Sequence, residues 1–126
     1  MTLKPSKARL ILLFGLLATG IGFDLPAAKS QPYPDPPWTL DPAIVRQLEA
    51  RAVMPEGTKP IDAYTRYYVP GYDHERRVVY GLLKEGGDKR IHLSNGPIIM
   101  DGGCSVVELI FDVTAGQVTS IKCNGA

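Results

Sequence analysis

Residues 61–84 read IDAYTRYYVPGYDHERRVVYGLLK. Apolar and aromatic residues alternate with polar ones on both sides of the central PGYDHE, which indicates two half-buried strands at residues 61–69 and 76–84. The proline, glycine and polar residues of 70–75 are typical of a loop. We therefore predict an antiparallel hairpin, with Val69 opposite Arg76.

A second hairpin is predicted at the C-terminus. Residues 105–113 and 117–123 are rich in β-branched and aliphatic residues, and Gly116 between them suits a left-handed turn position. The pairing expected from a three-residue loop is Leu109 with Ile121 and Phe111 with Thr119.

Between the two hairpins, residues 89–94 form another predicted strand. A glycine pair at 86–87 is expected to turn this strand back beside residues 76–84. The longer connection 95–103 contains Pro97, which cannot extend a ladder of hydrogen bonds. We expect this connection to pack its apolar residues beneath the sheet, namely Ile98, Ile99 and Met100.

An amphipathic helix is predicted before the sheet. Asp41 offers an N-cap acceptor, and Pro42 suits the first helical position. Apolar residues then recur on one stripe, while charged side chains such as Glu49 point away from it. The stripe consists of Ile44, Val45, Leu48 and Ala52. Pro55 and Gly57 end the helix.

The predicted pairing divides the side chains between two faces of the sheet, and we expect the helix to cover the more apolar one. Its members are Ala63, Tyr67, Val69, Val78, Tyr80, Leu82, Ile91, Leu93, Val107, Leu109, Phe111, Val113, Ile121 and Cys123. The expected fold class is α+β, with one helix on a four- to five-stranded antiparallel meander. This order resembles the cystatin-like architecture over roughly residues 41–123, but no inhibitor motif matches, so the resemblance implies no function.

The N-terminus has the three parts of a secretory signal. Basic residues precede an uncharged apolar run at 10–23, and small residues follow. We expect residues 1–30 to be removed, with cleavage after Ser30 or, alternatively, after Ala28. The protein is then periplasmic or secreted. The remaining chain has 10 basic and 12 acidic residues, a formal net charge of −2, which predicts no affinity for nucleic acid or membrane from bulk charge.

The two cysteines, Cys104 and Cys123, both lie in the expected mature chain. In an oxidising compartment two cysteines close one disulfide and leave none over. The predicted register does not favour this pairing, because Cys104 lies about three residues from the position opposite Cys123. Either a bulge after Gly103 brings the two together, or the register is wrong.

Residues 31–40 contain four prolines and are expected to form an extended arm ahead of one domain at 41–126. We expect Trp38 and Leu40 to pack onto the domain as a lid. The alternative is that the arm is a proline-rich ligand for a partner.

The predicted outer face of the sheet combines basic and aromatic side chains. Guanidinium groups bind carboxylates and phosphates, and tyrosine rings stack on flat ligands. The candidate binding residues are Tyr64, Arg66, Tyr68, Arg77, Arg90 and His92. The alternative is an ordinary solvated sheet, in which arginine side chains lie across tyrosine rings.

No motif supports catalysis, a cofactor or a metal site. The residues Asp73, His74 and Glu75 are neighbours in one loop, which rarely suffices to hold a metal ion. Asp101, His92 and His74 are the acid–base candidates if the protein is an enzyme, the least favoured class. The leading hypothesis is an exported binding or inhibitory module for an unknown partner. The alternative is a carrier that holds an anionic or aromatic molecule between sheet and helix. The protein is expected to be a monomer or an edge-strand dimer.

Overall fold

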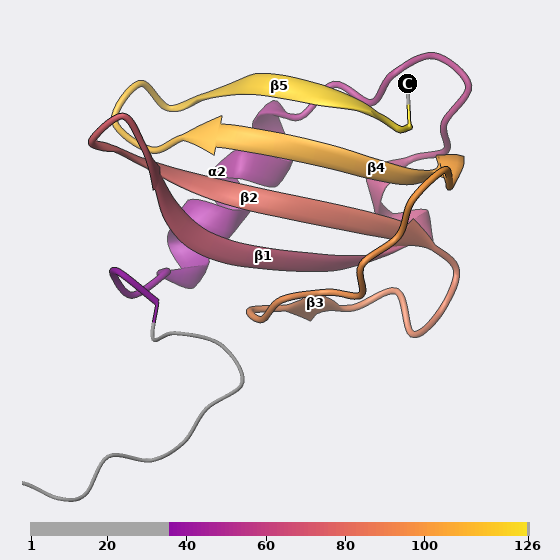
Figure 1. Cartoon of the computed structure of the whole chain (residues 1–126), viewed down its shortest axis with the longest axis horizontal. Coiled ribbons are helices and arrows are strands. Elements are labelled where there is room, and N and C mark those ends of the chain that lie inside the picture. The colour runs from indigo at the N-terminus through magenta and orange to yellow at the C-terminus, as the bar shows by residue number, and fades with distance from the viewer. Residues whose placement is uncertain (1–35, 126) are drawn as a thin grey trace, which may run out of the picture. The chain divides into compact units, whose positions relative to one another are not determined.

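Five strands form one mixed sheet in the spatial order β3-β1-β2-β4-β5 (Figure 1). The computed structural model describes residues 36–125, so the expected signal at 1–30 and the first half of the arm lie outside the described residues. The elements are α2 (Pro42–Arg51), a short 3-10 helix η1 (Ile61–Ala63), β1 (Tyr64–Asp73), β2 (Arg76–Glu85), β3 (Ile91–His92), β4 (Gly103–Asp112) and β5 (Gln117–Asn124).

The helix follows the sequence prediction closely. The Asp41 carboxylate accepts a hydrogen bond from the Ala43 N–H at 2.8 Å, and Pro42 opens the first turn. Val45 and Leu48 are buried against the sheet. Glu49 differs from the prediction, because its side chain turns toward the sheet and binds there.

The β1–β2 hairpin is tighter than predicted. Asp73 pairs with Arg76, so only His74 and Glu75 form the loop. Both have positive φ, 51° and 72°, as a two-residue hairpin loop of this handedness requires. Pro70 therefore lies within β1 and not in the loop. The predicted pairing of Val69 with Arg76 is wrong by four residues, because proline and glycine were taken to mark the end of the strand.

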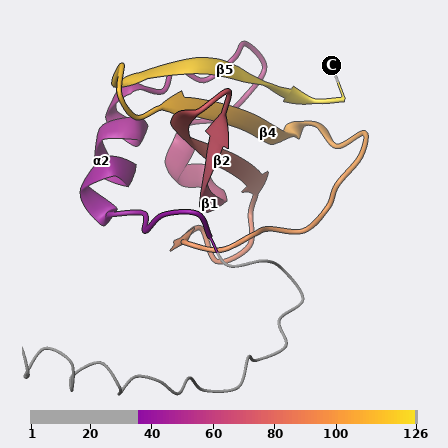
Figure 2. The same ribbon diagram turned by 60° about the vertical axis from the view of Figure 1, so that its left-hand side comes forward.

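The order of the strands also differs from a meander. The predicted hairpin of residues 76–84 with 89–94 is absent from the described chain: β3 pairs with β1 in parallel, with Arg66 opposite Ile91 and Tyr67 opposite His92. β4 takes the other side of β2. The chain from β3 to β4 consequently crosses the sheet on the face opposite α2 (Figures 1 and 2).

The helix covers the face of β1 and β2 that was expected to be outside. Its buried members are Tyr64, Arg66, Tyr68, Val79 and Leu83, which join the correctly predicted Val107, Leu109 and Phe111. Both faces of this hairpin carry apolar or aromatic residues, so alternation alone left the choice open. Side-chain hydrogen bonds distinguish the two faces, because Arg66 and Tyr68 donate to Glu49 of α2 only from this face.

The disulfide between Cys104 and Cys123 is present, with a Cα–Cα separation of 4.6 Å. Val107 pairs with Cys123 as predicted, yet Gly103 pairs with Asn124. Three extra residues of β4 therefore form a bulge that brings Cys104 beside Cys123. A second irregularity after Ile110 places Phe111 opposite Val118, and not opposite Thr119 as predicted.

The end of the arm and β3 cover the edge of β1 that faces away from β2. Trp38 donates a hydrogen bond from Nε1 to the Gly71 carbonyl at 2.9 Å, and Leu40 is buried in the core. Pro70 has no N–H with which to bind a further strand. β3 pairs with β1 nearer its beginning, at Arg66 and Tyr67. The end of the arm thus packs onto the domain as predicted, and β5 is the edge strand on the opposite side of the sheet.

Candidate functional site

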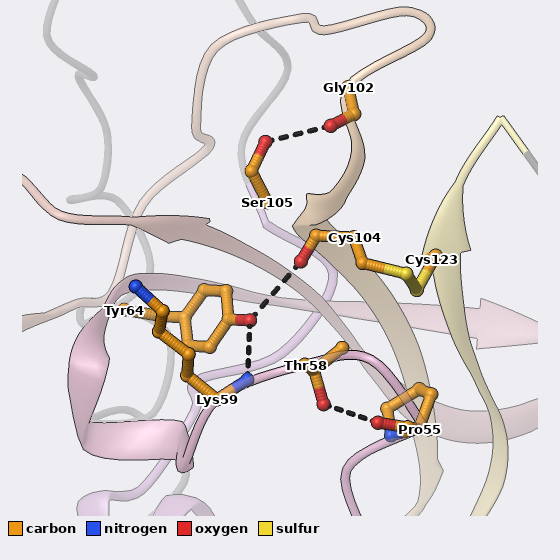
Figure 3. The surroundings of a disulfide bond; sticks show 8 residues. All are labelled: Pro55, Thr58, Lys59, Tyr64, Gly102, Cys104, Ser105 and Cys123. Carbon is orange, nitrogen blue, oxygen red and sulfur yellow. Dashed lines mark hydrogen bonds between the residues drawn. A yellow bond between two sulfur atoms is a disulfide. The ribbon is translucent and has the colours of Figure 1, made fainter.

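The six predicted binding residues do not form one surface. Tyr64, Arg66 and Tyr68 lie beneath α2, and each is at most 8% exposed. The Tyr64 hydroxyl donates a hydrogen bond to the Cys104 carbonyl at 3.2 Å and accepts one from the Lys59 N–H at 3.1 Å (Figure 3). The sequence prediction therefore placed three core residues on a solvated face.

Arg66 and Tyr68 share the Glu49 carboxylate. The Arg66 guanidinium donates to both carboxylate oxygens, at 3.0 and 3.2 Å, and the Tyr68 hydroxyl donates at 2.7 Å. The bond from Glu49 raises the pKa of Arg66, while burial and the same carboxylate raise the pKa of the Tyr68 phenol well above its usual value. Arg66 also donates to the Lys89 carbonyl at 3.0 Å. These contacts join helix to sheet and leave no room for an anionic ligand at Arg66.

The other three residues are at the periphery. Arg77 is exposed and lies over the Trp38 ring, 5.0 Å from its centroid. Arg90 is exposed, and its backbone N–H donates a hydrogen bond to the Asp88 carboxylate. This bond and the side chain of His92 lower the pKa of the Asp88 carboxyl. His92 contacts Asp88 at 2.8 Å and stacks on Tyr67 at 5.1 Å. A binding role for these three residues stays a prediction.

The acid–base candidates are likewise apart. His74 contacts Asp73 at 2.7 Å in the exposed hairpin loop, and Asp101 is exposed in the β3–β4 connection. Within residues 36–125, no three His, Cys, Asp or Glu side chains gather as metal ligands would. In that same part of the chain, no helix is long and apolar enough to cross a membrane.

A groove of about 460 Å³ lies on the sheet face opposite α2. Its floor consists of side chains that β1, β2 and β4 direct away from the helix, and residues 94–98 of the β3–β4 connection form its wall. The floor residues are Tyr67, Val69, Tyr80, Leu82, Glu108 and Ile110. The sequence pattern placed Tyr67, Val69, Tyr80 and Leu82 in the core beneath the helix, so it did not predict this groove.

Two glycines let neighbouring segments approach the tyrosines of the groove. A Cβ at position 96 would lie 2.7 Å from the Tyr67 ring, so glycine is needed where the connection crosses β1. A Cβ at position 71 would lie 2.5 Å from the Tyr80 ring, which covers that glycine across the strands. Glycine at these two positions therefore leaves room for the Tyr67 and Tyr80 rings.

The β3–β4 connection carries exposed apolar side chains. Ile98 is 90% exposed and Met100 81%, contrary to the prediction that both pack beneath the sheet. Of the exposed large apolar residues, Tyr80 and Ile98 line the groove, whereas Met100, Ile91 and Leu93 are exposed outside its lining. In contrast, the side chains between the sheet and α2 pack as a hydrophobic core of buried residues.

Asn124, a residue without any signal in the sequence, fixes the far end of the connection. It is 5% exposed, and its side chain binds the Ile99 carbonyl at 3.1 Å and the Gly102 N–H at 2.7 Å. Its amide also donates to the Glu108 carboxylate. One buried amide thus links the connection to both β4 and β5.

No protein-family model matches this chain, and neither the curated proteins nor the solved structures contain a match.

Proposed function

We propose that the protein is a small exported binding module whose contact surface is the groove together with Ile98 and Met100 of the β3–β4 connection. The observation that carries the proposal is the exposure of Ile98 in the wall of a groove floored by tyrosine and aliphatic side chains, with Met100 exposed two residues further along the chain. Contiguous exposed apolar area is unfavourable in water and is typical of interaction sites. Neither residue belongs to the hydrophobic core beneath α2, so packing in that core does not account for them.

Aromatic and aliphatic side chains in a concave setting are the usual anchors of protein interfaces. This surface replaces the basic and aromatic face expected from the sequence, of which Tyr64, Arg66 and Tyr68 lie beneath the helix. The partner contact is accordingly apolar in character and does not depend on Arg66.

A photoreactive phenylalanine analogue at position 98 or 80 tests the contact surface directly. Irradiation of the native protein in its own compartment should give the same covalent adduct from both positions. Val53 is 78% exposed and lies outside the groove lining, so the analogue at position 53 is the matched control. Adducts that are absent, or equally abundant at position 53, would overturn the proposal.

Export is the second part of the proposal, and the Cys104–Cys123 disulfide is compatible with it. The intact mass of protein from fractionated cells tests this part. We expect a chain that begins at Gln31 or Lys29, with thiol alkylation only after reduction. A full-length mass with two free thiols would contradict export.

A carrier of small apolar molecules is the second candidate function, because 460 Å³ falls within the usual range for ligand pockets. Native mass spectrometry of protein purified without denaturation distinguishes the two. A bound small mass that is lost in Leu82→Glu would favour the carrier.

A further inference from the structure

Asparagine or aspartate is followed directly by glycine at three places in the described C-terminal half. These pairs are Asn95–Gly96 and Asp101–Gly102 in the β3–β4 connection and Asn124–Gly125 at the end of β5. In such a pair the glycine nitrogen can attack the preceding side-chain carbonyl carbon, because glycine has no Cβ to hinder the approach. The reaction needs a side chain that is free to turn back onto the main chain and a glycine N–H that no other group holds.

Asn95–Gly96 meets both conditions. Asn95 is exposed, belongs to no helix or strand and lines the groove. Within residues 36–125, no backbone carbonyl accepts a hydrogen bond from the Gly96 N–H. Glycine is nevertheless needed here, because a Cβ at position 96 would lie 2.7 Å from the Tyr67 ring. The residue that makes this pair reactive is therefore required by the path of the connection.

Asn124–Gly125 does not meet the first condition. The Asn124 side chain is only 5% exposed, and its oxygen accepts a hydrogen bond from the Gly102 N–H at 2.7 Å. Its nitrogen donates to the Ile99 carbonyl at 3.1 Å and to the Glu108 carboxylate. Both amide hydrogens are thus in use. The carbonyl carbon of Asn124 reaches the Gly125 nitrogen only after these bonds have opened.

The same contact protects Asp101–Gly102. The nucleophile of that pair is the Gly102 nitrogen, whose N–H donates to Asn124. A carboxylate is also attacked less readily than an amide. One buried side chain therefore blocks two of the three pairs.

We infer that Asn95 is a site of spontaneous deamidation in the folded protein, whereas the fold protects Asn124 and Asp101. The Gly96 nitrogen loses its proton and forms a bond to the side-chain carbonyl carbon of Asn95, and the amide nitrogen leaves as ammonia with that proton. Water then hydrolyses the cyclic imide at one of its two carbonyl groups, which gives aspartate or isoaspartate. Water is the only co-reactant, and no electrons are transferred.

Both products change the groove. Among the described residues that line it, Glu108 is the only charged one, so deamidation adds a second carboxylate. In isoaspartate the main chain is also longer by one carbon atom, directly before Gly96 passes the Tyr67 ring. The ammonia is lost to the solvent, so the change is one-way. It goes beyond the proposed binding role, because it does not depend on what the groove binds.

Incubation of the native, disulfide-bonded protein in mildly alkaline buffer tests this inference. Peptide mapping by mass spectrometry identifies each amide that has become a carboxyl group, and an isoaspartyl methyltransferase with a labelled methyl donor detects isoaspartate. We expect conversion at position 95. Position 124 should react about tenfold more slowly or less, because at least one hydrogen bond of Asn124 must open first.

Two controls separate the fold from the local sequence. In reduced protein unfolded in urea, Asn95 and Asn124 should convert at similar rates, because both precede glycine. Asn95→Gln should abolish the isoaspartate signal, since its longer side chain forms the larger ring only slowly. Position 95 is exposed, so this variant keeps its fold.

Three outcomes overturn the inference. The first is an absence of conversion at position 95 in the native protein. The second is equal conversion at positions 95 and 124 in the native protein, which would show that the hydrogen bonds of Asn124 do not protect it. The third is an isoaspartate signal that persists in Asn95→Gln, which would place the reaction at another residue.

Discussion

The Arg66 guanidinium and the Glu49 carboxylate form a two-point ion pair across the interface of α2 and β1, with N–O distances of 3.0 and 3.2 Å. The side chains are 10% and 17% exposed. Because the guanidinium also binds the Lys89 carbonyl before β3, one side chain connects the helix, the central hairpin and the edge strand.

Removal of one partner of this pair should destabilise the domain more than removal of both. Arg66→Met leaves the Glu49 carboxylate without its cation, and breaking a buried pair in this way costs about 3 kcal/mol. Arg66→Met combined with Glu49→Leu should recover part of that loss. Urea unfolding of the two single variants and the double variant gives the coupling energy. Strictly additive effects would show that the pair does not act as a unit.

Asp112 should make stability depend on acid pH. The Ala115 N–H and then Arg76 lower the pKa of this carboxyl. A carboxyl whose pKa is lower in the folded than in the unfolded state stabilises the fold at pH values above its unfolded pKa of about 3.9. This stabilisation is lost as the pH falls through the folded-state pKa. Asp112→Asn should therefore be less stable than the wild type at pH 7, and the difference should shrink at pH 3. Urea midpoints at both pH values measure this; an equal difference at both would contradict the linkage.

Reduction of the disulfide should lower the melting temperature strongly. Closing a loop of this length, with a sequence separation of 19, stabilises by about 3 kcal/mol. For a domain of this size that corresponds to roughly 12–24 °C. Calorimetry with and without reductant tests the estimate, and the Cys104→Ala, Cys123→Ala variant should match the reduced wild type. An unchanged melting temperature would mean that the bulge holds without the bridge.

Gly96→Ala should displace the β3–β4 connection from the groove, because the new methyl group would lie 2.7 Å from the Tyr67 ring. Overpacking of this kind costs about 1–3 kcal/mol. Amide NMR shifts should change in residues 94–100, and Tyr67→Ala should restore them in the double variant. Gly86→Ala is the control for replacing a glycine by alanine without a clash, because no atom lies within 4 Å of the added Cβ. Its destabilisation comes only from the φ of +83° in the turn.

The local elements of this protein follow from its sequence. The N-cap at Asp41, the left-handed Gly116 and the pairing of Leu109 with Ile121 depend on residues near one another in the chain, and all three predictions are confirmed. The disulfide was also predicted, and the bulge that makes it possible was one of the two alternatives that the sequence left open. Steric preferences and short loops act over a few residues, so the sequence expresses them directly.

The tertiary structure alone decided which face of the sheet the helix covers. Both faces of the β1–β2 hairpin are apolar enough to be buried, and the energies that separate them come from Glu49 meeting Arg66 and Tyr68, residues 17 and 19 positions away. The candidate site depends on that choice, because the groove forms on the face left open and the β3–β4 connection crosses it. Alternation with a period of two specifies that a strand has two faces, whereas contacts between distant segments specify which of them becomes the core.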